Sequence, residues 1–304
     1  MLRWLWLGVP LFGLAELGAH QYFAHRAPNP AEWQALRPAV AALRQSDELV
    51  VVAPYWAEPM ARQAFGTEFF PVMEVARPDV TAFRRAIEVG ILGERSVELA
   101  SWRLVEERQQ GRFRLRVLEN PQPRTARFDF WSGLGPAETE VSLEDSTGRY
   151  ACSYTTQAAG STGGLHGHIA FPGVRFQCPG SPEVFVGQTI VDDQDYRPRR
   201  CLWAHPPGQG VLVVRYASVP LGQAVRGYGA LSWFLWRDGG NPPVELEVRV
   251  DGESIGTFVH RDEQGWHGFE FPTGDHAGKN ASVEFRVRSD RPGNREFCFW
   301  ADTR

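Results

Sequence analysis

Apolar residues recur at helical spacing early in the chain. Trp33, Leu36, Val40 and Leu43 lie three or four positions apart, which predicts a helix over residues 28–45. An Asn-Pro pair at its start, with a glutamate three residues after the asparagine, is typical of a capped helix N-terminus.

The pattern then alternates between short strand-like and helix-like runs. We expect a strand at 50–53, a short helix at 58–66, a strand at 69–75, a helix over 78–92, and strands over 96–107 and 112–120. Alternating elements of this kind are typical of a small α/β domain, here over residues 28–120, with a parallel sheet.

The pattern changes after a proline-punctuated stretch at 120–128. Short runs of alternating polarity follow, separated by Gly, Pro, Asp and Asn turns, with a hairpin signal at Asp251-Gly252. Strands this dense predict a β-sandwich or barrel. We divide this part into a β-rich connecting region, 121–182, and a sandwich domain, 183–304, so the expected fold class is α+β multidomain.

The N-terminal stretch 1–25 has one basic residue, Arg3, and then an uncharged apolar run that only Glu16 interrupts. This predicts an uncleaved signal anchor that crosses the membrane, with a cleaved signal or a buried helix as alternatives. Because basic residues stay on the cytoplasmic side, the bulk of the chain is expected to be extracytoplasmic, in the periplasm or at the cell surface.

Composition narrows the function classes. The chain has 304 residues, a formal net charge of −4, and 43% hydrophobic and 22% charged residues. These values are typical of a folded globular protein and give no indication of nucleic acid as a partner. The sequence has no HExxH or Walker A motif and no glycine fingerprint after the first strand, so it indicates no particular reaction.

Residues 183–304 resemble a galactose-binding-like jelly-roll sandwich. The segments that carry the resemblance are VELEVRVDGESIGTF, QGWHGFEFPTGDHAGKNASVEFRVRS and REFCFWADTR. In that family an opening strand lies near the last one. The resemblance therefore implies a Cys201–Cys298 disulfide, which leaves Cys152–Cys178 as the second pair, with free buried thiols as the alternative.

Residues 27–66 resemble the exoplasmic α/β region of protein-mannosyltransferase-like membrane glycosyltransferases. A helix leads there, as here, into an acidic residue, a valine-rich strand, a proline and aromatic residues. The resemblance implies kinship with surface-glycan systems, and no catalytic residue carries over.

Three carboxylates precede three arginines between positions 192 and 200. Asp192, Asp193 and Asp195 are candidate oxygen ligands for a structural Ca²⁺. The alternative is that the arginines pair with these carboxylates, which also cap turns. Two further candidates, His166 and His168, would share one face of a strand as metal ligands, or would belong to a glycine-rich loop.

Aromatic residues beside polar ones indicate a sugar site. Trp233 and Trp236 would point to opposite faces of a strand, and a turn-rich edge follows later. The expected ligand-binding residues are Trp266, His260, Arg261, Asp262 and Trp236, with His267 nearby. Pyranoses combine apolar faces with hydroxyl groups, which suits such a surface, and plain packing is the alternative.

The sequence therefore predicts a membrane-anchored extracytoplasmic protein with a non-catalytic binding module, for which carbohydrate is the expected ligand class. Two alternatives stay open: an enzyme or accessory subunit of cell-surface glycan metabolism, and a scaffold that binds an envelope protein.

Overall fold

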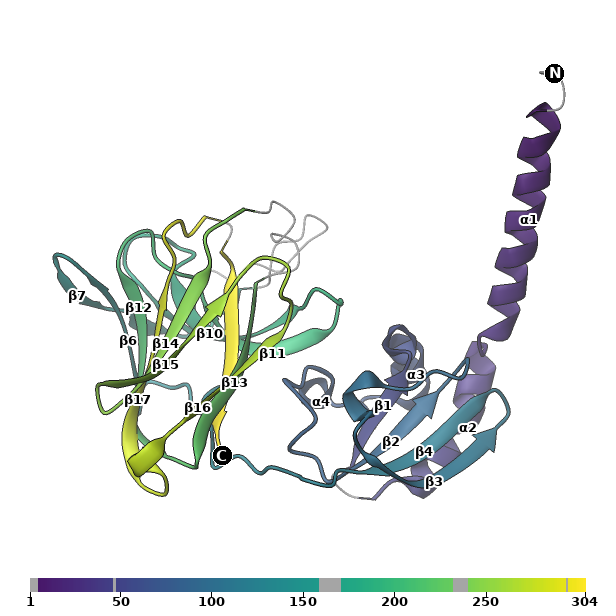
Figure 1. The fold of residues 1–304 in the computed structure, drawn as a ribbon, viewed down its shortest axis with the longest axis horizontal. Helices are drawn as coiled ribbons and strands as arrows, with labels where there is room; N and C mark the ends of the chain where they lie inside the picture. The colour runs from purple at the N-terminus through teal and green to yellow at the C-terminus, as the bar shows by residue number, and fades with distance from the viewer. Residues whose placement is uncertain (1–4, 46–47, 159–170, 232–239, 294) are drawn as a thin grey trace. The chain divides into compact units, whose positions relative to one another are not determined.

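The computed structural model describes residues 5–45, 48–158, 171–231, 240–293 and 295–304. The chain forms two compact units (Figure 1). Unit 1 comprises Met1–Glu74 and Asp79–Arg124, and unit 2 comprises Val75–Pro78 and Thr125–Arg304. The short segment Val75–Pro78 is thus part of unit 2, although the residues on both sides of it belong to unit 1.

Unit 1 contains a four-stranded sheet in the order β1-β2-β4-β3. Its strands are β1 (Leu49–Ala53), β2 (Arg85–Gly90), β3 (Arg103–Gln110) and β4 (Phe113–Glu119). The helices in this part of the chain are α1 (Leu5–Arg26), α2 (Pro30–Leu43), α3 (Glu58–Phe65) and α4 (Val72–Val75), with short 3-10 turns at Tyr55–Ala57 and Val97–Leu99. The expected parallel sheet is wrong in part, because only β1 and β2 run parallel.

The helix predicted over 78–92 is also wrong, because residues 85–90 form β2 in the middle of the sheet. Every position from Ala86 to Gly90 is buried, so the strand lacks the alternating pattern that would have identified it. Residues 69–75 were predicted to form a strand, but they contain the short helix α4 instead. This helix begins just after Pro71, and proline is well suited to a helix start.

An ion pair is buried in this sheet. Arg116 Nη1 lies 2.5 Å from Glu88 Oε1, and the two side chains are 3% and 0% exposed. The second carboxylate oxygen of Glu88 accepts a hydrogen bond from the backbone N–H of Ser96 at 2.7 Å. Arg116 Nε also lies 2.6 Å from Glu107 Oε2, but the Glu107 side chain is 40% exposed. Removing Glu88 therefore takes away the buried partner of a buried charge.

We predict that Glu88→Gln lowers the free energy of unfolding by about 3 kcal/mol, because Arg116 then loses its buried counter-charge. The matched control is Glu106→Gln, which breaks the exposed pair with Arg108 on β3 and should cost less than about 0.5 kcal/mol. Urea denaturation of both variants measures the difference, and equal losses would contradict the prediction.

Unit 2 is an antiparallel β-sandwich, as expected. One sheet has the order β16-β13-β18-β11-β10-β9-β8, with β5 paired to β18, and the other has the order β15-β14-β17-β12-β6-β7. The strands of the eight-stranded sheet are β5 (Phe128–Asp129), β8 (Ser153–Thr155), β9 (Arg175–Gln177), β10 (Phe185–Asp192), β11 (Pro198–Ala204), β13 (Ala224–Leu231), β16 (His267–Pro272) and β18 (Phe297–Thr303).

The strands of the six-stranded sheet are β6 (Thr139–Asp145), β7 (Gly148–Ala151), β12 (Val211–Pro220), β14 (Val244–Val250), β15 (Glu253–His260) and β17 (Asn280–Arg288), and a 3-10 turn lies at Gly274–His276. The predicted hairpin turn at Asp251-Gly252 joins β14 to β15, with positive φ at both residues. Residues 121–182, expected to connect two domains, supply β5 to β9 of these two sheets.

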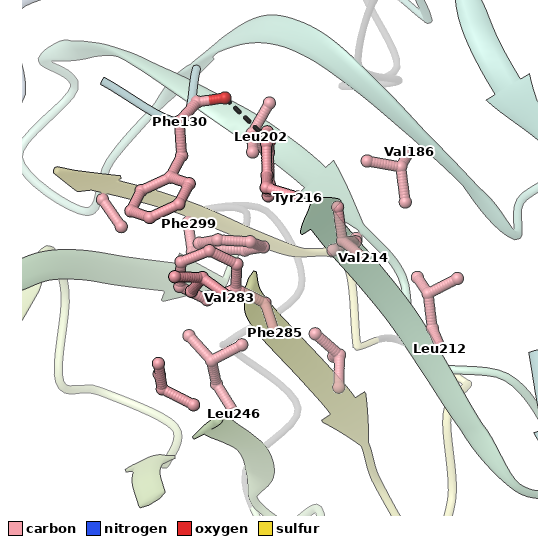
Figure 2. Packing of buried hydrophobic residues seen from close by; sticks show 14 of the residues in the cluster. Phe130, Val186, Leu202, Leu212, Val214, Tyr216, Leu246, Val283, Phe285 and Phe299 are labelled. Atoms are coloured by element: carbon pink, nitrogen blue, oxygen red, sulfur yellow. Dashed lines mark hydrogen bonds between the residues drawn. The ribbon is translucent and has the colours of Figure 1, made fainter. Parts of the chain in front are cut away.

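Aliphatic and aromatic side chains fill the space between the two sheets (Figure 2). Phe130 lies edge-on to Tyr216, with ring centroids 4.9 Å apart, and edge-on to Phe285 at 4.7 Å. The hydroxyl of Tyr216 donates a hydrogen bond to the carbonyl oxygen of Phe130 at 2.7 Å. This bond satisfies the polar atom that Tyr216 carries into the core.

Both expected disulfides are present. Cys152–Cys178 and Cys201–Cys298 span sequence separations of 26 and 97 residues. In the chain-entropy account, loops of these lengths correspond to a stabilisation of about 3.5 and about 4.7 kcal/mol.

No helix among the described residues is both long and apolar enough to cross a membrane. The predicted anchor over residues 1–25 is therefore not supported. α1 covers most of that stretch, and it contains the polar side chains of Glu16 and His20.

Candidate functional site

The outer face of the six-stranded sheet carries a network of arginine–glutamate pairs. On β17, Arg286 lies 2.7 Å from Glu144, and Arg288 lies 2.5 Å from Glu245. Apolar residues alternate with these charged ones along β14 and β17 and point into the core. This face therefore combines paired charges with exposure to solvent.

The outer face of the eight-stranded sheet is apolar and largely covered. Along β11, Leu202 belongs to the core between the sheets, so Cys201 and Trp203 point to the other side. Trp203 stacks on Phe185 with centroids 5.4 Å apart and on His205 at 6.2 Å. A second cluster on this side contains Val191, Cys201, Cys298 and Trp300, with Trp131, Tyr228 and Trp266 packed against it.

Trp266, the expected sugar platform, is half-buried in this second cluster. Its ring stacks on Tyr228, with centroids 5.6 Å apart and planes within 7°, and Arg199 Cζ lies 5.8 Å from the ring centroid. The indole N–H donates to the carbonyl oxygen of Pro78 at 2.8 Å. Trp266 therefore helps to hold the segment Val75–Pro78 on unit 2.

The other expected ligand residues near this turn also have partners within the fold. His260 is fully buried, with Nε2 2.9 Å from the carbonyl oxygen of Gly265. Asp262 is paired with the buried Arg295 at 2.6 Å, whereas Arg261 is exposed. That these residues bind a ligand stays a prediction. Trp233 and Trp236 lie outside the described residues, as do His166 and His168.

The carboxylate of Asp193 organises the turn after β10. One of its oxygens accepts from the backbone N–H groups of Asp195 at 2.9 Å and Arg197 at 3.0 Å, and the other accepts from Arg199 Nε at 2.9 Å. Asp193 is buried, whereas Asp192 and Asp195 are exposed. The acid–arginine pairing is therefore present at Asp193. Among the described residues no three His, Cys, Asp or Glu side chains gather in a way that could hold a metal. Calcium binding by Asp192, Asp193 and Asp195 stays a prediction.

A pocket of about 470 Å³ opens where the eight-stranded sheet ends at β8. β8 and β9 pair antiparallel, with Ser153 opposite Gln177 and Thr155 opposite Arg175. Opposite residues, and residues two apart on one strand, share a face, so these four polar side chains line the same surface. The other described residues that line it are Ala151, Ala158, Cys178 and Pro179.

Gln177 is held in place by its amide nitrogen. Nε2 donates to the carbonyl oxygens of Cys178, Ser181 and Val184 at 3.2 to 3.4 Å. These bonds fix the carboxamide and leave Oε1 without a hydrogen bond from the described residues. The disulfide at Cys178 ties the end of β9 to Cys152, next to the start of β8, so both strands of the pocket are held at one end.

Arg175 lies over the sheet beside Gly187 of β10. Its guanidinium carbon is 4.4 Å from the ring centroid of Phe185. A side chain at position 187 would place its Cβ 2.8 Å from Pro172 Cγ and 3.1 Å from Arg175 Cβ, so glycine makes this close approach possible. Sequence reasoning missed Arg175, Gln177, Ser153 and Thr155. The one available signal was the alternation of Arg175 and Gln177 within an expected strand.

No protein-family model matches the sequence, and no curated protein matches it. Among solved structures, the chain is similar to CBM51 from Clostridium perfringens GH95 in complex with methyl-galactose, at 14% identity and a TM-score of 0.28, covering 38% of this chain and 81% of that one. It is similar to the CBM51-2 and INT domains of C. perfringens ZmpB, at 12% identity and a TM-score of 0.29, covering 54% of this chain and 37% of that one.

A third similar structure is the CBM36-1 domain of a multidomain xylanase from the hindgut metagenome of Trinervitermes trinervoides, at 14% identity and a TM-score of 0.22, covering 38% of this chain and 82% of that one. Likenesses at these identities and TM-scores establish neither the ligand nor the family of this chain. The comparisons give no support to the glycosyltransferase resemblance of residues 27–66.

We predict that His260 makes unit 2 less stable in mild acid. Burial lowers its pKa, and the hydrogen bond to Gly265 opposes that shift. The unfolded chain therefore takes up a proton near the ordinary histidine pKa of about 6.5, whereas the folded chain does so only at lower pH. The free energy of unfolding should fall as the pH drops from about 7 to 5, and His260→Gln should remove part of that fall.

Denaturant unfolding at several pH values gives the free energy of unfolding at each pH. The change of this free energy with pH is then compared between variants, because a general loss of stability would shift all values equally. His205 offers a matched variant, because burial lowers its pKa too, and His205→Gln should remove a further part. An unchanged pH dependence in the double variant would contradict the prediction.

Proposed function

We propose that unit 2 is a non-catalytic carbohydrate-binding sandwich and that its ligand binds in the pocket on β8 and β9. The observation that carries the proposal is the set of polar groups that line this pocket. Ser153 and Thr155 supply hydroxyl groups, Gln177 supplies a fixed carbonyl oxygen, and Arg175 supplies N–H donors.

This mixture of donors and acceptors suits a sugar. A pyranose presents many hydroxyl groups, each of which both donates and accepts hydrogen bonds. A pocket of about 470 Å³ lies within the range of small-molecule sites, and the rigid pairing of β8 with β9 positions its polar groups before a ligand arrives.

Both disulfides lie in the same unit as this pocket. Disulfides persist in oxidising compartments, and we therefore place the binding reaction outside the cytoplasm. A glycan of the cell surface or its surroundings would be the partner.

We predict that Thr155→Trp abolishes glycan binding, because an indole on the pocket face of β8 fills the space that the sugar needs. The matched control is Tyr154→Trp, one residue away on the same strand with its side chain on the opposite face, which should bind like the wild type. A glycan array probed with the full chain identifies the ligand, and calorimetry with that ligand compares the variants.

Circular dichroism of both variants checks that they are folded. Glycan binding that survives Thr155→Trp would place the ligand elsewhere on the protein. An array without any bound glycan would contradict carbohydrate binding itself.

A further inference from the structure

Arg175 carries a buried charge whose counter-charge is not found among the described residues. The residue is 5% exposed, and burial lowers the pKa of its guanidinium, which nonetheless stays protonated at neutral pH. Among the described residues its one hydrogen bond runs from Nη1 to the carbonyl oxygen of Pro172 at 3.5 Å, the limit of such a bond, and Nε has no partner there. Within that part of the chain, the charge is desolvated without being neutralised.

The described lining of the pocket supplies no acid either. Of the described residues that line the pocket, Arg175 is the one that carries a charge. The chain between β8 and β9, residues 156–174, contains neither Asp nor Glu. An internal salt bridge from this part of the chain is therefore ruled out by composition.

An aromatic ring supports the guanidinium without using its N–H groups. The guanidinium carbon lies over the ring of Phe185, which is itself fully buried and stacked on Trp203. A cation over an aromatic ring is stabilised by the face of the ring, so hydrogen bonds at the edge of the guanidinium stay available. Phe185 thus acts as a fixed support for Arg175.

A buried arginine ordinarily has a carboxylate partner, because an uncompensated buried charge is costly. Arg116 in unit 1 has such partners in Glu88 and Glu107. Arg175 differs in lining a pocket that is open to a ligand. A ligand that brings its own negative charge would complete the pair.

We propose that the pocket on β8 and β9 selects acidic sugars, with Arg175 binding the carboxylate of a hexuronate. The inference rests on the proposed function and names its ligand class. The planar guanidinium can bind a carboxylate through two parallel N–H···O bonds. Ser153, Thr155 and Gln177 would then bind the sugar hydroxyl groups.

The test is calorimetric titration of the full chain with three ligands of equal length: an oligohexuronate, the same oligosaccharide with its carboxyl groups reduced to alcohols, and a sulfated neutral counterpart. We expect the oligohexuronate to bind at least about tenfold more tightly than the reduced form. Arg175→Gln should bring the two affinities to within about twofold of each other. Arg288→Gln, which removes an exposed arginine from the six-stranded sheet, should leave the ratio unchanged.

The wild-type comparison does not depend on the folding of any variant, and Arg175→Lys, which keeps the positive charge, supplies a second variant. Equal affinity for the acidic and reduced forms would overturn the selection of acidic sugars and leave carbohydrate binding in place. Equal or tighter binding of the sulfated form would overturn the choice of a carboxylate. Binding of none of the three, with an empty glycan array, would overturn both proposals.

Discussion

The packing of aromatic rings between the two sheets is the interaction on which the rest of unit 2 depends. Phe130 follows the short strand β5 of one sheet, and Tyr216 and Phe285 come from the other, so their edge-on contacts join the two layers (Figure 2). Burial, and to a lesser extent the charge of Asp129, raise the pKa of Tyr216. Its hydroxyl keeps the proton that it donates to the carbonyl oxygen of Phe130 across the core.

The two outer faces of the sandwich carry different kinds of side chain. One is covered by paired arginines and glutamates and faces water, while the other carries stacked rings and the segment Val75–Pro78. Only the second face offers an apolar support for a buried cation. The pocket lies at the end of that face, where the sheet stops at β8 and its polar side chains are not covered by a further strand of the described chain.

Local patterns predicted the sandwich, because alternation and turn residues can be recognised in short stretches of sequence. The resemblance to a jelly-roll family implied both disulfides. The strand β2 was missed because a central strand buried on both faces has no alternation, and apolar residues around it fall at helical spacing. The pocket could not be predicted because it depends on which strands pair. Arg175 and Thr155 lie 20 residues apart, and only the register of β8 with β9 places them opposite each other.

Because β8 and β9 both lie between Cys152 and Cys178, the pocket sits inside a covalently closed ring of chain. Cleavage of a single peptide bond within residues 156–174 would open this ring without separating the two strands, since the disulfide still joins them. In surroundings rich in proteases, such a nicked molecule would keep its pocket. On an electrophoresis gel it would run as two fragments only after reduction.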